Sequence, residues 1–71
     1  MLDFNKKVSL YVLIKRKEKG YKQSEMAEFL GVTKLTYLKK ENAKTVFTFE
    51  EIVKIKEILS INIEDMLEKI K

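Results

Sequence analysis

A glycine interrupts a helical pattern in the middle of the stretch EFLGVTKLTYLKK, residues 28–40, and a second helical pattern follows after only two residues. Gly31 suits the left-handed conformation that ends a helix, because it has no Cβ to clash with the backbone. The hydroxyl of Thr33 can then cap a second helix that begins at once. The pattern predicts helices over 23–30 and 34–41, joined by the tight corner of a helix-turn-helix.

Three further helices are predicted around this pair from apolar spacing and capping residues. The first covers residues 4–18, where apolar side chains recur every three or four positions. Thr48 and Glu51 have the spacing of a capping box that opens the fourth helix, and Asn62 can cap the fifth. Asn42 is expected to take the left-handed conformation that ends the third helix.

Together these segments predict an all-α fold, with one domain of five short helices over residues 1–71. A domain near this size buries only about 60% of its unfolded surface, so every apolar face matters. The predicted core takes side chains from all five helices: Val8, Val12, Met26, Ala27, Leu30, Val32, Tyr37, Ile52, Ile55, Leu59, Ile61 and Leu67.

The composition excludes several kinds of chemistry. The 71 residues include no cysteine and no histidine, so disulfides, thiolate catalysis and the commonest metal ligand are missing. An enzyme is therefore the least supported class, and we predict neither a cofactor nor a metal site. No apolar run approaches the ~20 residues of a membrane span. The amino terminus also lacks the cleavage pattern of a signal peptide, so a cytoplasmic protein is expected.

The net charge of +4 is unevenly distributed along the chain. Residues 1–22 carry +5, residues 23–47 carry +1, and residues 48–71 carry −2. This distribution favours a polyanionic partner for the first two thirds of the chain. Charge alone does not exclude the alternative, which is a set of solvated lysines without a partner.

The run GYKQSEMAEFLGVTKLTYLKKEN resembles the helix-turn-helix domains of the lambda-repressor/Cro (XRE-like) family. That family opens the first helix of the pair on Gln and carries Glu-Leu-Ala within it. Leu-Gly-Val-Ser/Thr forms its corner, and Glu-Asn-Gly ends the second helix. The corresponding residues of this chain are 23, 25–27, 30–33 and 41–42. The likeness extends over residues 12–67, because LSINIEDML resembles the family's carboxyl-terminal ending.

The resemblance implies a sequence-specific binder of double-stranded DNA, a Cro-like repressor of phage or bacterial origin. The helix at 34–41 would then lie in the major groove. By position, the base contacts would fall to Lys34, Leu35 and Lys39. The phosphate contacts would fall to Lys22, Gln23, Thr36, Asn42 and Lys44. Arg16 and Glu41 match a family pair that forms an internal ion pair between the first and third helices.

Several positions depart from the family pattern. Lys22 replaces the usual capping Thr or Ser, while Ala43 and Ser60 replace glycines. Lys40 occupies a position that is usually apolar and buried, and Leu38 occupies one that is usually polar. These changes bear on how the third helix is seated.

A homodimer is expected, because one short helix reads too few base pairs to find a site in a genome. The favoured contact surface is the carboxyl-terminal helix, with Ile63, Met66 and Ile70. The alternative is an apolar stripe on the first helix, with Leu10, Leu13 and Ile14. A different class of function also stays open: a protein-interaction or antitoxin-like regulatory module that keeps this fold. Such a module would bind its partner through Leu38 or the first-helix stripe.

Overall fold

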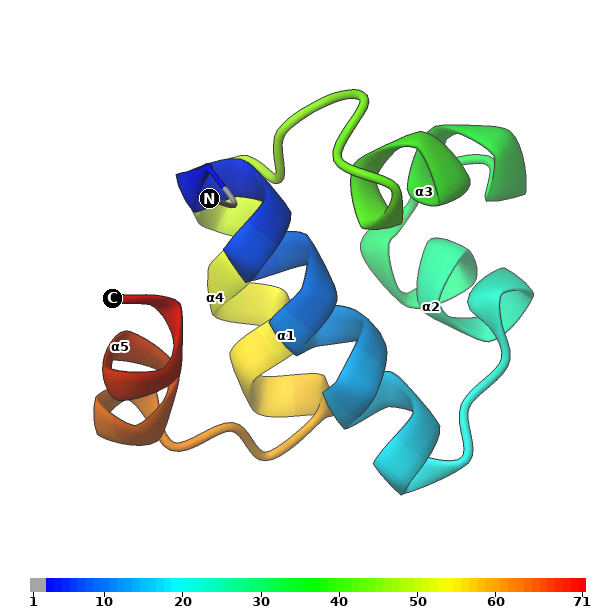
Figure 1. The fold of residues 1–71 in the computed structure, drawn as a ribbon. Helices are drawn as coiled ribbons and strands as arrows, with labels where there is room; N and C mark the ends of the chain where they lie inside the picture. Colours follow the sequence, from blue (N-terminus) through cyan, green and yellow to red (C-terminus); the bar gives the residue numbers. More distant parts are fainter. Residues whose placement is uncertain (1–2) are drawn as a thin grey trace.

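The computed structural model describes residues 3–71, whose helices are shown in Figure 1. They are α1 (Phe4–Lys19), α2 (Gln23–Leu30), α3 (Lys34–Glu41), α4 (Phe49–Ile58) and α5 (Ile63–Ile70). Since the described part of the chain contains five helices and no strand, the predicted all-α fold is confirmed. None of these helices is long and apolar enough to cross a membrane.

Helix α1 runs through the middle of the molecule, with α2 and α3 on one side and α5 on the other (Figure 1). The helices α2 and α3 pack on each other, α3 also packs on α1, and α2 packs on α4. On the opposite side, α5 packs against α1. The loop of residues 42–48 leads from the end of α3 to the start of α4. Helix α1 therefore supports two different sides of the molecule.

The corner between α2 and α3 forms as the sequence predicted. Gly31 has a φ of 72°, which places it in the left-handed region. The next amide, that of Val32, donates to the carbonyl of Ala27 at 3.0 Å and closes the end of α2. The Thr33 hydroxyl accepts from the amide of Thr36 at 3.1 Å and caps α3. Two backbone devices thus fix the angle at which α3 leaves the pair.

The end of α3 differs from the prediction, which gave the left-handed residue as Asn42. Asn42 has a φ of −90°, and its amide donates to the Leu38 carbonyl at 2.9 Å, so the helical pattern continues through it. The chain reverses one residue later, at Ala43, whose φ is 60°. Ser60 also has a positive φ, of 53°. Both positions that replace family glycines keep the conformation that glycine would take.

The core is close to the predicted one, with one exchange on α5 and with Tyr11 of α1 in addition. The buried apolar residues are Tyr11, Val12, Met26, Ala27, Leu30, Tyr37, Ile55, Leu59, Ile61, Met66 and Ile70, with Val8, Val32 and Ile52 half-buried against them. The assignment of Leu67 to the core was wrong, since it is 54% exposed. Met66 and Ile70, which are four apart and share one helix face, occupy the core instead, since theirs is the face that packs on α1.

Candidate nucleic-acid interface

Helix α3 buries one face and exposes the face that carries the predicted base-contacting residues. Tyr37 is completely buried, and its ring centroid lies 6.1 Å from that of Phe47. Lys34 and Lys39 are exposed, and Leu35 is 63% exposed. The exposed face therefore offers two cations and one apolar side chain that the core does not use.

Two other residues of α3 are half-buried. The Thr36 hydroxyl is hydrogen-bonded to the hydroxyl of Thr33 at 2.9 Å, so this predicted phosphate ligand is engaged in the corner. Leu38 is also half-buried. Less of its apolar surface is therefore free for a protein partner than its unusual place in the family pattern suggested.

A polar cleft beside α3 joins this helix to α1 and to the start of α2. Its lining comes from all three helices and their ends: Leu13, Arg16, Lys17, Lys22, Gln23, Ser24, Lys34, Glu41 and Asn42. The structure thus brings together Lys22, Gln23, Lys34 and Asn42, which the sequence assigned to DNA. Lys39, Lys44, Thr36 and Leu35 lie outside this cleft. Three lysines around one hollow favour an anionic ligand.

Two residues of the cleft, Lys17 and Ser24, were not predicted from the sequence. Lys17 is exposed in the last turn of α1, where a cation is also explained by the negative end of the helix dipole. Ser24 is exposed in the first turn of α2. Spacing places Lys17 on the same side of α1 as Leu13, four positions earlier, but Leu13 was assigned to the dimer stripe, so the sequence carried no signal for this cleft.

The start of α2 is capped from one side only. The amide of Lys22 donates to Glu25 Oε1 at 2.8 Å, which is the backward half of a capping box. The Lys22 side chain has no oxygen to accept from the amides of the first turn, and α2 shows no side-chain cap bond there. Helix amides of this kind can donate to an anion, and the helix dipole supports it.

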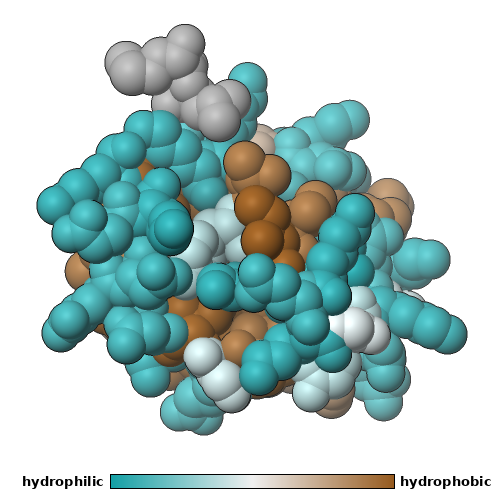
Figure 2. Space-filling view, turned by 60° about the horizontal axis from the view of Figure 1, so that its bottom comes forward, coloured by the Kyte–Doolittle hydropathy of each residue, from teal (hydrophilic) through white to brown (hydrophobic). Residues whose placement is uncertain are grey.

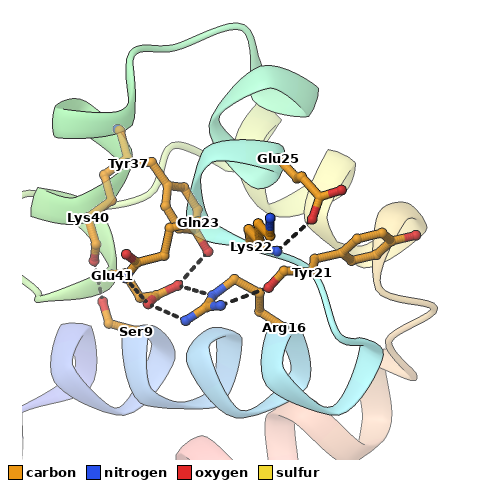
Figure 3. Close-up of polar contacts among 9 residues, drawn as sticks. All are labelled: Ser9, Arg16, Tyr21, Lys22, Gln23, Glu25, Tyr37, Lys40 and Glu41. Carbon is orange, nitrogen blue, oxygen red and sulfur yellow. Dashed lines mark hydrogen bonds and ion pairs between the residues drawn. The ribbon is translucent and has the colours of Figure 1, made fainter.

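A buried network fixes the floor of the cleft (Figure 3). Arg16 and Glu41 form the expected ion pair through two hydrogen bonds, Nε to Oε2 at 2.9 Å and Nη2 to Oε1 at 3.1 Å. Arg16 Nη1 also donates to the Tyr21 carbonyl at 2.8 Å. Glu41 further accepts from the Tyr37 hydroxyl at 2.6 Å and from Gln23 Nε2 at 2.9 Å. One carboxylate therefore joins α1, α2 and α3.

The hydrogen bonds of this network favour the charged forms of Glu41 and Arg16. Burial by itself would raise the pKa of Glu41, but hydrogen bonds from Arg16, Tyr37 and Gln23 lower that pKa below its usual value. The bond to Glu41 raises the pKa of Arg16. Burial, followed by the bond to Glu41, raises the pKa of the Tyr37 hydroxyl well above its usual value. Gln23 donates one amide hydrogen to Glu41, and its second amide hydrogen can be donated to a phosphate.

The carboxyl-terminal helix does not present the surface that was predicted for a dimer. Met66 is 5% exposed and Ile70 is 6% exposed, so both are buried in the core of the protein and offer little surface to a partner. The reason is again the helix phase, which turns these two residues toward α1. Ile63 and Leu67, at 37% and 54% exposed, are the apolar residues of α5 that reach the surface.

An apolar groove of about 220 Å³ lies beside these exposed residues. It is lined by Phe4, Asn5, Val8, Ser9, Val46, Phe47, Ile52, Ile63, Met66, Leu67 and Ile70, and thus by no charged side chain. Phe4 and Leu67 also line a second, adjoining hollow together with Lys7, Ile70 and Lys71, so they form a ridge between the two.

The stripe predicted on α1 is divided between two surroundings. Leu10 and Ile14 are 46% and 45% exposed and line a separate groove. Five charged residues also line that groove: Lys7, Lys15, Glu18, Asp65 and Lys69. Leu13 instead lines the polar cleft beside α3. A space-filling view illustrates how hydrophobic residues reach the surface between hydrophilic ones (Figure 2).

Comparison with known proteins gives one match. A family model described as helix-turn-helix matches residues 12–66, more than three quarters of the chain. Comparisons with curated proteins and with solved structures found no significant match. Within residues 3–71, no group of three or more acidic, histidine or cysteine side chains could hold a metal ion.

Proposed function

The chain belongs to the helix-turn-helix family of DNA-binding regulators, and we propose that it is a sequence-specific transcriptional repressor of the Cro type. It would act on double-stranded DNA in a bacterial cytoplasm, as a phage or bacterial protein. The observation that carries this proposal is the polar cleft beside α3, where three lysines and the start of α2 converge next to an exposed helix face. Backbone binding and base reading then occupy neighbouring surfaces.

Base reading is assigned to the exposed face of α3. Lys34 and Lys39 can donate to guanine O6 and N7 in the major groove. Leu35 can contact the methyl group of thymine, which is a reason for a leucine that is 63% exposed. The ends of α3 are fixed by the Thr33 cap and by the Glu41 network, so these side chains are presented from a rigid helix.

Phosphate binding is assigned to the rim of this face. Lys22, Gln23 and Asn42 line the cleft, and we add Lys17 from the end of α1. Lys44 lies outside the cleft in the loop after α3, where its exposed side chain can reach the next phosphate. Such contacts fix the register of the protein on the duplex without carrying sequence information.

Dimerisation is assigned to the ridge of Phe4 and Leu67 with the apolar groove beside it. Interface centres are depleted of charged residues, and this groove has none in its lining. The groove that contains Leu10 and Ile14 would bury five charged side chains, which costs desolvation. A two-fold pair would place its two reading helices on half-sites about one helical turn apart.

Selection of bound sequences from a random duplex pool tests the proposal. An enriched palindrome is the expected result, since it would establish both base reading and two-fold symmetry. In the enriched site, Lys39→Ala should cost ~1–3 kcal/mol and relax the base preference. The matched control is Lys54→Ala, an exposed lysine on α4, which should bind as the parent does. An unenriched pool with no salt-dependent binding would favour the protein-interaction alternative.

A further inference from the structure

A buried lysine ties the reading helix to the segments around it. Lys40 is 9% exposed, and its Nζ donates to the Val46 carbonyl at 3.0 Å and to Glu51 Oε1 at 2.8 Å. Its own carbonyl accepts from the Ser9 hydroxyl at 2.7 Å. This one residue connects α3 with α1, with the loop that follows α3, and with the first turn of α4.

The Glu51 carboxylate, which accepts from Lys40, also caps α4. Glu51 Oε1 also accepts from the amide of Thr48 at 2.8 Å, while the Thr48 hydroxyl accepts from the Glu51 amide at 3.1 Å. Burial alone would raise the pKa of Glu51, but the bonds from Lys40 and Thr48 lower it. The same charged group therefore caps α4 and holds the lysine.

Backbone bonds anchor the first part of the loop of residues 42–48, and Lys40 anchors its later part. At the beginning, the amides of Lys44 and Thr45 donate to the carbonyl of Lys39 at 2.8 and 3.3 Å. Further along the loop, Lys40 holds the carbonyl of Val46. The exposed side chain of Lys44 leaves this loop at the first anchor, two residues before Val46 and next to the end of the reading helix.

Stability alone does not call for a lysine at this position. A buried ion pair can often be replaced by apolar residues of similar volume at little cost, because its desolvation offsets much of its attraction. What an apolar side chain cannot do is bind the Val46 carbonyl. The specific contribution of Lys40 is therefore directional, since it sets the path of the loop.

We propose that the Lys40–Glu51 ion pair is a positioning device that holds loop 42–48, and with it Lys44, in place for a phosphate contact. The inference rests on the proposed DNA-binding function. It goes beyond it by giving a role to a residue that touches no DNA, at a position where the family pattern is apolar. It predicts that Lys44 is useful only while the pair is intact.

The test uses the full chain and the doubly substituted variant Lys40→Met/Glu51→Gln. Methionine keeps the unbranched stem of the lysine, and glutamine keeps an oxygen for the Thr48 amide. Removing both charges leaves no buried ion without a partner, so this variant should stay folded. Lys44→Ala is then made in the parent and in the double variant, which completes a double-mutant cycle.

We expect the double variant to bind a selected operator roughly fivefold more weakly than the parent, as for one rim charge contact. The slope of log affinity against log salt should fall by about 0.9, which corresponds to one lost phosphate contact. Lys44→Ala should have this effect in the parent and almost none in the double variant. Base preference should stay unchanged in every case.

Equal effects of Lys44→Ala in both backgrounds would overturn the inference, because Lys44 would then act without the pair. Amide hydrogen exchange of the free proteins gives a readout that needs no DNA. Exchange at Lys44 and Thr45 should be faster in the double variant, and unchanged exchange would also overturn the inference. If the parent binds no duplex, the proposed function fails, and the exchange measurement still decides whether the pair holds the loop.

Discussion

The two sides of α1 are built from different chemistry. Toward α2 and α3, a buried carboxylate collects hydrogen bonds from Arg16, Tyr37 and Gln23. Toward α5, the buried contact is apolar, through Met66 and Ile70, and at its edge the Tyr11 hydroxyl donates to Asp65 Oδ2 at 2.7 Å. We refer to the first as the polar junction and to the second as the apolar seam.

The difference matches what each side has to do. Hydrogen bonds are directional, so the polar junction fixes the angle of α3 relative to the start of α2, as a reading surface requires. Apolar packing is not directional, and the apolar seam continues outward into a surface of Phe4 and Leu67. The side with fixed angles suits DNA, and the side with apolar surface suits a second copy of the chain.

The largest effect should come from breaking the polar junction. Glu41→Ala would leave Arg16 buried without its counter-charge and should lower the free energy of unfolding by about 3–5 kcal/mol. Urea denaturation followed by circular dichroism measures this loss. The control is Glu50→Ala, since Glu50 forms an exposed pair with Lys54, and the change there should stay below about 1 kcal/mol. Similar losses in both variants would mean that the junction is not a special source of stability.

The apolar seam should be broken by Met66→Ala, which should lower the free energy of unfolding by about 2–5 kcal/mol because it leaves a cavity against α1.

The neighbour of Met66 separates folding from association. Leu67→Ala should change the stability of the monomer by less than about 1 kcal/mol, since the side chain is 54% exposed. It should nevertheless weaken the dimer, as measured by sedimentation over a concentration series. Unchanged association after Leu67→Ala would contradict the proposed dimer surface.

Acid should weaken the polar junction before it affects the apolar seam. The folded-state pKa of Glu41 lies below its usual value, so the unfolded chain binds more protons there as the pH falls. This contribution to stability is complete above the unfolded pKa of about 4.3 and is lost as the pH falls through the lower folded value. Glu51 acts in the same direction. Unfolding free energies measured between pH 7 and pH 3 should decline at the acid end, and less steeply in Glu41→Gln.

The sequence was most informative where a local rule acts alone. Gly31, Thr33 and the Thr48–Glu51 capping box each determine a helix end through their own backbone or side chain, and all of them were predicted. The assignment of Leu67 was wrong because several apolar residues of α5 compete for one buried face. Only the contact with α1 decides which of them is buried.

The candidate site divides in the same way. The family register predicted that Lys34, Lys39 and Leu35 are available on α3. It could not reveal that Lys17 shares a cleft with Lys22, because that depends on how the end of α1 is packed against the start of α2. Contacts between distant segments are set by the tertiary structure, and one sequence carries no direct signal for them.

The smallest effect concerns two turns that contain a residue with a positive φ, one after α3 at the polar junction and one before α5 at the apolar seam. Ala43 follows the reading helix and Ser60 precedes α5, and both have a positive φ. A left-handed residue with a side chain costs about 1–2 kcal/mol, whereas glycine removes this cost but adds about 0.5–1 kcal/mol of chain entropy in the unfolded state. Ala43→Gly and Ser60→Gly should each raise the free energy of unfolding by about 0.5 kcal/mol. The two gains should add in the double variant, because the turns lie in separate parts of the chain and share no hydrogen bond. A loss of stability in Ala43→Gly would show that the loop after α3 depends on a stiff residue there, as a loop that positions Lys44 could.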